Sequence, residues 1–293
     1  DIIINDREEF FEEGATTINM WAADFEEWQN QLNIQQRMDF NDIKDDGIQL
    51  AQTFIQQSDI DDRLRSARET NSMPDIYMIS LGNLYKEINR GNAADISSYI
   101  NTWDDLVDNA SEAVTYGGKK YGYPICIEPS SLVFYRKDLL QQYGNTTEIP
   151  TKWDDFLALC GTIKKNIKAA GVKGVYAFDV PKGVACAWAT VGMQASVTGG
   201  LAITDDWSES RLMGDGKEGY LALGNIWAEL YGNGYIPLAS GAYNEYITPL
   251  CLGNQVMTTA GSWSISEVVN SYPEMVDKIG VAVMPTLDGN QDV

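Results

Sequence analysis

The sequence predicts an α/β protein with two domains. Along its N-terminal part, segments typical of strands alternate with segments typical of helices, and this order favours a mainly parallel sheet covered by helices. The chain has 293 residues, 44% of them hydrophobic, so it can bury a sizeable core and is long enough for two domains. Near its middle, a polar break that contains Pro129 separates two apolar runs.

This polar break marks the expected boundary between the domains. Tyr123 to Ile127 before it and Leu132 to Tyr135 after it are rich in aromatic and β-branched residues and are expected to form strands. Proline lacks a backbone donor and resists central strand positions. We therefore expect the chain to leave one sheet at Pro129 and to enter another, with domains over residues 1–127 and 128–293.

The first domain is expected to alternate strand and helix from its first element onward. Trp28, Leu32 and Ile34 have the apolar spacing of a helix. The acidic start of the segment 59–69 suits the positive end of a helix dipole. The expected elements are a strand at 16–21, a helix at 24–38, a strand at 48–55, a helix at 59–69, a strand at 73–79 and a helix at 84–88.

The second domain is expected to contain further helices and short strands. After Pro150, Thr151 is expected to cap a helix whose first turn holds Asp154 and Asp155, and the helix is expected to close at Gly171. Apolar residues on one face predict a second strong helix later in the chain. The further expected elements are a strand at 175–178, helices at 185–197 and 219–231, and strands at 255–259 and 279–284.

The charge balance argues against several kinds of partner. Acidic residues outnumber basic residues 42 to 21, and the resulting net charge of -21 opposes binding to nucleic acid or to anionic lipid. The sequence contains no run of 18 apolar residues, so it predicts no membrane span. The segment Asp1 to Asn5 lacks the basic start of a signal peptide, so we expect that any such signal has already been removed.

The absence of histidine excludes most of the usual catalytic groups. Ser-His-Asp and Cys-His catalysis and every histidine-containing metal site require a residue that this chain lacks, although paired carboxylates could still act. The cysteines are widely spaced, without a C-x-x-C pair or a zinc pattern, so we expect buried thiols rather than disulfides. These cysteines are Cys126, Cys160, Cys186 and Cys251.

Three apparent motifs do not fit their context. Gly214 to Gly219 matches G-x-G-x-x-G, but it follows a polar segment and places carboxylates where a phosphate would bind, so a loop before a helix is favoured. Asp42 to Thr53 lacks the ligands of a calcium loop, and Gly261 to Ile265 is no nucleophile elbow. We therefore expect no cofactor, no bound metal and no catalytic residue.

Five patterns occur in the order found in one family of binding proteins. Together they resemble the extracellular solute-binding proteins of ATP-driven (ABC) importers, and within that family the sugar-binding branch similar to maltose-binding protein. The resemblance covers the chain from about Thr16 to Gly289. The patterns are Pro74-Asp75-Ile76, the central stretch from Lys119 to Leu140, Lys152-Trp153-Asp154-Asp155, Gly253 to Trp263, and Ile279 to Pro285.

The resemblance implies a fold, a partner and a location. The fold is the two-lobe periplasmic-binding-protein type II architecture, in which a hinge joins two α/β lobes and a ligand cleft lies between them. The protein would be a monomeric, non-catalytic carbohydrate receptor that docks with a membrane permease. It would be periplasmic, or held on the outer face of the cell membrane by a lipid anchor. In the family the chain returns to the first lobe after the Met-Pro strand, whereas this sequence ends at Val293.

Aromatic and acidic side chains supply what a sugar site needs. A pyranose has apolar C–H faces and a rim of hydroxyls, which call for aromatic plates and for carboxylates or amides. The resemblance implies that Trp263 stacks on the sugar and that Glu128, beside the hinge, accepts hydrogen bonds from hydroxyls. Core packing and a solvated hinge carboxylate are the alternatives. Trp21 and Asp24 lie where the first strand ends, the usual ligand edge of an α/β sheet, although Trp21 could equally belong to the core.

The resemblance also points to a second group of ligand contacts. Ser80 and Asn83 correspond to a loop after the third strand, where helix capping explains Ser80 almost as well. Asp179 and Trp188 fall near a second-lobe segment that contacts ligand in relatives, and Tyr243 is a candidate in a later loop. The remaining tryptophans with helical or capping contexts are interpreted as structural, and these are Trp103, Trp153, Trp207 and Trp227.

Two other functions are compatible with these residues. A glycoside hydrolase could use a carboxylate pair such as Glu128 and Glu245 without histidine, although the strands and helices do not follow eight repeating βα units. A receptor of the same fold could instead bind a polyamine or another cation, because aromatic boxes with carboxylates also hold ammonium groups.

Overall fold

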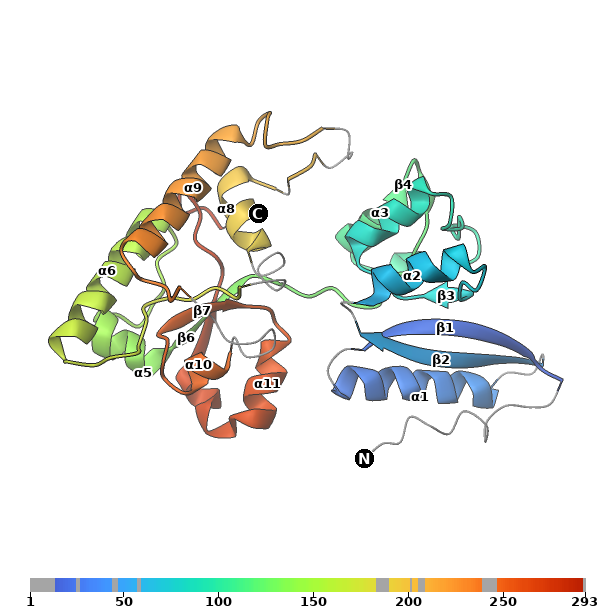
Figure 1. Ribbon diagram of the computed structural model, residues 1–293, viewed down its shortest axis with the longest axis horizontal. Coiled ribbons are helices and arrows are strands. Elements are labelled where there is room, and N and C mark those ends of the chain that lie inside the picture. Colours follow the sequence, from blue (N-terminus) through green and yellow to red (C-terminus); the bar gives the residue numbers. More distant parts are fainter. Residues whose placement is uncertain are drawn as a thin grey trace. The chain divides into compact units, whose positions relative to one another are not determined.

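The computed structural model describes residues 14–24, 27–43, 47–56, 59–182, 190–200, 202–204, 209–238 and 247–291. The chain divides into two compact units, with the boundary between Ile127 and Glu128. Within the described ranges, no helix has both the length and the apolar character that crossing a membrane requires. Each unit combines helices with a small sheet (Figure 1).

The first unit is built on a parallel sheet, as predicted. Its strand order is β2-β1-β3, and β1 pairs with β2 in register from Thr16 opposite Ile48 to Asp24 opposite Gln56. Helix α1 lies on one side of this sheet and α2 and α3 on the other (Figure 1). The bounds are β1 Thr16–Asp24, α1 Glu27–Ile43, β2 Ile48–Gln56, α2 Ile60–Glu69, β3 Ile76–Tyr77 and α3 Leu81–Asn89.

The core of the first unit joins α2 to the sheet. Ile55 of β2 packs with Ile60 and Leu64 of α2, all three of them buried. Trp21 and Tyr77, on neighbouring strands, pack against this cluster from the sheet. The rest of the unit consists of short elements, which are a 3-10 turn at Trp103–Asp105, α4 at Asp108–Ala113, and the antiparallel pair of β4 at Thr115–Tyr116 and β5 at Lys119–Lys120.

A buried carboxylate ties α2 to α3. The side chain of Glu87 accepts hydrogen bonds from Arg68 of α2 to both of its oxygens at 2.9 Å, from Arg90 at 2.8 Å and from Asn92 at 2.9 Å. Burial by itself would raise the pKa of this carboxyl, but the hydrogen bonds from Asn92 and Arg90 and the charges of both arginines outweigh it. The pKa of Glu87 therefore lies below its ordinary value.

The second unit contains an antiparallel sheet, for which the sequence predicted strands but no direction. Its central strand β6 pairs antiparallel with both neighbours, in the order β7-β6-β8. An extended segment from Tyr176 to Asp179 continues the sheet by hydrogen bonds to residues 254–259, parallel to β7. The bounds are β6 Leu132–Arg136, α5 Lys137–Leu139, a π-helical turn at Leu140–Gly144, α6 Trp153–Ala169, α8 Val191–Thr198, α9 Lys217–Gly232, α10 Thr248–Cys251, β7 Met257–Ala260, α11 Ser264–Ser271, a 3-10 helix at Pro273–Lys278 and β8 Ile279–Ala282.

Both faces of this second sheet are buried, each in its own core. Side chains alternate between the faces of a strand, so Val133 of β6 enters one cluster and Phe134 enters the other. On β7, Met257 belongs to the first cluster and Ala260 to the second. A strand covered on both sides has a nearly continuous apolar sequence, which is why its strand character could be predicted but its direction could not.

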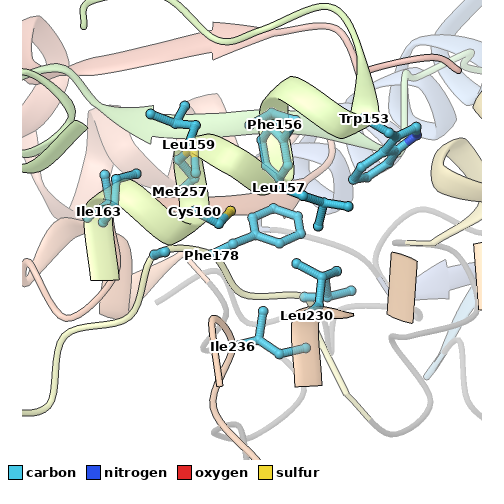
Figure 2. Close-up of a cluster of buried hydrophobic side chains, with 14 of the residues drawn as sticks. Trp153, Phe156, Leu157, Leu159, Cys160, Ile163, Phe178, Leu230, Ile236 and Met257 are labelled. Carbon is cyan, nitrogen blue, oxygen red and sulfur yellow. The ribbon is translucent and has the colours of Figure 1, made fainter. Parts of the chain in front are cut away.

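The larger of these clusters is centred on α6. Figure 2 shows the aromatic and aliphatic side chains of this helix meeting residues from other elements. Phe156 lies between Trp153 and Phe178, with its ring edge-to-face to each at centroid distances of 5.4 and 5.1 Å. Leu230 of α9 and Met257 of β7 belong to the same cluster. The interpretation of Trp153 as a structural residue agrees with its full burial.

Several local expectations were wrong. Tyr123 to Ile127 forms no strand, and Tyr123, Ile125 and Ile127 are exposed, because no strand within the described ranges pairs with them. Cys126 is exposed too, whereas Cys160 and Cys251 are buried as expected. Cys186 lies outside the described residues. Helix α6 is preceded by Lys152 at its N-cap, without a side-chain cap, so Thr151 does not cap it.

Candidate functional site

In the first unit, the predicted site residues gather at the carboxyl edge of the parallel sheet. Trp21 and Asp24 lie at the end of β1, and Ser80 and Asn83 follow β3, which pairs with β1 at Trp21 opposite Tyr77. Parallel strands end at the same edge, so the topology brings these residues together. Open α/β sheets bind their ligands at this edge.

The side chains at this edge have protein partners. The carboxylate of Asp24 accepts a hydrogen bond from Asn30 at 2.6 Å and another from Gln56 at the end of β2. Asn83 donates to Asp61 at 2.6 Å and accepts from Lys86 at 2.7 Å. These groups form a polar rim whose amides and carboxylates are already oriented by their neighbours.

Trp21 fits its alternative interpretation, core packing, at least as well as a ligand role, whereas Ser80 lies at a helix N-cap without the side-chain bond that the capping alternative requires. Trp21 is half-buried and packs against the small core of the first unit. Ser80 is the N-cap residue of α3, and its carbonyl accepts the amides of Asn83 and Leu84, both at 3.0 Å. Its exposed hydroxyl makes no capping hydrogen bond, so it stays available to other partners.

In the second unit, Glu128 and Trp263 lie at the same end of the β6–β7 pair. The antiparallel register of the strands ends at Leu132 opposite Ala260, and one further hydrogen bond joins the segments just beyond this pair. The amide of Ser262 donates to the carbonyl of Pro129 at 2.9 Å. The residue that follows the domain boundary and the proposed stacking residue are therefore each one residue away from the same hydrogen bond.

The carboxylate of Glu128 is half-buried and lacks a hydrogen-bond donor among the described residues. Burial disfavours the charged form and raises the pKa of this carboxyl. A partly desolvated acceptor gains most from a ligand that brings its own donors. Sugar hydroxyls and ammonium groups are both donors of this kind.

Trp263 occupies the N-cap position of α11 and is half-buried. Its carbonyl accepts a hydrogen bond from the hydroxyl of Ser266 at 2.7 Å and one from the amide of the same residue at 3.1 Å. The helix start thus fixes the backbone from which the indole projects, which suits a rigid aromatic plate.

Asp179 has the partners of a structural carboxylate. It is buried and accepts hydrogen bonds from the amide of Val180 at 2.8 Å, from Gln255 at 2.6 Å and from Lys182 at 2.5 Å. Burial raises the pKa of this carboxyl more than Lys182 and Val180 lower it. Its backbone carbonyl accepts the amide of Thr259 at 3.1 Å, so Asp179 holds the end of its segment against β7.

Sequence reasoning missed two glycines and a serine beside these residues. A Cβ atom on Gly261 would collide with Trp263, and a Cβ atom on Gly192 would collide with Ser131. The amide of Gly192, at the start of α8, donates to the hydroxyl of Ser131 at 2.9 Å. The available signal was a glycine two residues before the candidate tryptophan, but a close approach between distant segments leaves no mark in a single sequence.

Three predicted residues lie outside the described ranges. These residues are Trp188, Tyr243 and the Glu245 of the hydrolase alternative. Trp207 lies outside them too, whereas Trp103 donates from its indole nitrogen to the carbonyl of Ser97 at 3.0 Å, as a structural tryptophan does. Over the described part of the chain, no three histidine, cysteine, aspartate or glutamate residues are grouped as a metal would require.

Several solved structures have the same fold as this chain. They include the sugar-binding protein MalE from Xanthomonas citri, with a TM-score of 0.69 and 19% identity, which is matched over 94% of this chain and 67% of that one. The GacH receptor of Streptomyces glaucescens has a TM-score of 0.71 and 16% identity over 93% of this chain and 67% of that one. The lacto-N-biose I-binding protein of Bifidobacterium longum has a TM-score of 0.70 and 20% identity over 93% and 66% of the chains.

These likenesses define the class of fold, which is that of the maltose-binding-protein-like periplasmic binding proteins, as predicted. The chain spans about two thirds of the length of these structures. The sequence matches the family model of bacterial extracellular solute-binding proteins over residues 39–291, and the chain belongs to that family. An uncharacterized ABC transporter extracellular-binding protein from Pyrococcus horikoshii is 33% identical over 87 residues, which are 29% of this chain and 20% of that protein.

Proposed function

We propose that this chain is part of a carbohydrate receptor that binds an oligosaccharide and delivers it to the permease of an ABC importer. The observation that carries the proposal is that Trp263 and Glu128 lie at one end of the β6–β7 pair, each next to one residue of the hydrogen bond between Ser262 and Pro129. An aromatic plate beside a partly desolvated acceptor matches the apolar face and hydroxyl rim of a pyranose. Asp24 and Asn83, in the polar rim of the first unit, are proposed as further sugar-binding residues.

The names of the related structures support a neutral, hydroxyl-rich ligand. They include a receptor in complex with acarbose and a protein in complex with lacto-N-biose. In keeping with the family, we propose that the protein is either held on the extracellular face of the cell membrane by a lipid anchor or located in a periplasm. We further propose that the receptor is a monomer, returns its ligand unaltered and binds no nucleic acid.

A thermal-shift screen tests this function. A ligand that binds only the folded protein raises the melting temperature, by an amount that grows with its concentration. A panel of mono- and oligosaccharides should contain at least one member that does so, and calorimetry should then give saturable binding. A panel without a single stabilising sugar would contradict the proposal.

The stacking role of Trp263 has its own test. Trp263→Ala removes the plate and should weaken binding of the sugar found in the screen by about 2 kcal/mol, through lost stacking and burial. Trp103→Phe is a suitable control, because Trp103 lies in the first unit and is held by Ser97 and Tyr123. An affinity that calorimetry finds unchanged in Trp263→Ala would remove this residue from the site.

The polyamine alternative shares the motivating observation, because an ammonium group also donates to Glu128 and packs on an aromatic face. Salt separates the two ligands, since a cation held by a carboxylate should lose affinity steeply with ionic strength and a neutral sugar should not. Competition between spermidine and the sugar gives a second readout. Turnover of an aryl glycoside would instead favour the hydrolase.

A further inference from the structure

Gly261 and Trp263 are packed together more closely than any side chain at position 261 would allow. A Cβ atom on Gly261 would lie no more than 2.5 Å from three carbons of the six-membered ring of Trp263, which are Cε3, Cζ3 and Cη2. The ring therefore fills the space that any residue other than glycine needs for its side chain. Gly261 is absent from the glycines with positive φ, so its backbone conformation alone would admit other residues.

The backbone on both sides of Gly261 is held in place. The amide of Ser262 donates to Pro129 at 2.9 Å, and the carbonyl of Gly261 accepts the amide of Ser264 at 3.0 Å at the start of α11. On the other side, Ala260 is paired with Leu132 in the sheet and is buried. A methyl group at position 261 would therefore displace the indole more readily than the chain.

We propose that Gly261 is a positioning residue of the carbohydrate site. One part of the Trp263 ring packs directly on the backbone of Gly261, and this contact sets the plane of the indole. The proposal rests on the proposed stacking role of Trp263. Position 261 then governs how far the aromatic plate stands from the backbone, and hence the space left for a pyranose face beside Glu128.

A double-mutant cycle tests the contact and needs no ligand. Four proteins are compared by urea unfolding, namely the wild type, Gly261→Ala, Trp263→Ala and the double variant. If the ring is what the methyl group meets, Gly261→Ala should destabilise the wild type but should cost nothing further once the ring is absent. Gly224→Ala is the matched control, since that helical glycine has open space around it.

The same four proteins give a readout that a merely structural glycine would not change. The affinity of Gly261→Ala for the sugar of the screen should fall about tenfold, because a displaced ring no longer meets the pyranose. The double variant should bind within about twofold of Trp263→Ala alone. The near-ultraviolet circular dichroism of the tryptophans should change in Gly261→Ala and should not change in Gly224→Ala.

The outcomes separate this inference from the proposed function. Equal destabilisation by Gly261→Ala with and without the ring would overturn the inference, as would a Gly261→Ala protein that keeps full sugar affinity. If Gly261→Ala fails to fold, the double variant should still fold, and its failure to do so would also overturn the inference. A wild type that binds no sugar would defeat the proposed function, whereas the unfolding cycle would still decide whether Gly261 places the ring.

Discussion

Replacing Glu87 by glutamine should lower the stability of the first unit by about 2–3 kcal/mol. The carboxylate is buried and accepts four hydrogen bonds, two of them from Arg68, whose side chain is 24% exposed. Hydrogen bonds to charged groups contribute about 1.5–3 kcal/mol where they are shielded from water. The bond from Arg90, whose side chain is 52% exposed, adds little. Glutamine keeps one acceptor oxygen but turns an amide donor toward guanidinium donors.

The contribution of Glu87 to the stability of the first unit should depend on pH. The pKa of Glu87 is lowered by folding, so its carboxylate stabilises the folded state above the unfolded pKa of about 4.3. That contribution is lost as the pH falls through the lower, folded pKa. Glu87→Gln should therefore lose stability at neutral pH and should show a flatter decline in acid than the wild type.

Urea unfolding followed by circular dichroism, repeated from neutral pH into acid, measures both effects. Glu69→Gln is the matched control, because Glu69 is an exposed glutamate at the end of α2. A shift of about 2–3 kcal/mol corresponds to a fall of roughly 6–12 °C in the melting temperature for a unit of this size. A loss below about 0.5 kcal/mol, or an acid profile identical to that of the wild type, would refute the reasoning, since surface substitutions have effects of that size.

Three further results are expected. Phe156→Ala should destabilise the second unit by about 3–5 kcal/mol in urea unfolding, since the ring is fully buried, and a loss under about 1 kcal/mol would contradict the packing described. Burial raises the pKa of Glu128, so the sugar affinity that calorimetry measures should fall as the pH drops through that raised value. In Glu128→Gln the affinity should not depend on pH and should be about 1 kcal/mol weaker than that of the wild type at neutral pH. A wild-type affinity that does not change with pH would count against Glu128 as a ligand contact. Burial raises the pKa of the Cys251 thiol to about 11, so a thiol reagent near neutral pH should modify the exposed Cys126 long before Cys251, and the reverse order in peptide mapping would be inconsistent with the fold.

The first unit could be predicted well because its elements carry their own signals. The spacing of apolar residues and the acidic residues at helix starts predict the alternation of β1, α1, β2 and α2. Strands that alternate with helices in this order are expected to pair in parallel. Trp21 and Asp24 could be placed at a sheet edge for the same reason. The strand expected at 73–79 is only Ile76–Tyr77, because its length depends on the partner strand and not on its own sequence.

The second unit was harder because its pairings link distant segments. The apolar run of β6 predicts a strand, but the same run would suit a parallel or an antiparallel sheet. The β-rich composition of Tyr123 to Ile127 predicted a strand that does not form, since composition cannot supply a partner. The contact between Gly261 and Trp263 could not be predicted either, because it depends on a side-chain direction and not on spacing.

The sharing of β6 by two cores has a consequence for how the second unit opens. Val133 and Phe134 are adjacent residues whose side chains anchor opposite layers, so the separation of either layer would expose one face of the same strand. Local opening that spares this strand must therefore be confined to the periphery. Hydrogen exchange at the amides of β6 should report the free energy of complete unfolding, and these amides should be the last of the unit to exchange.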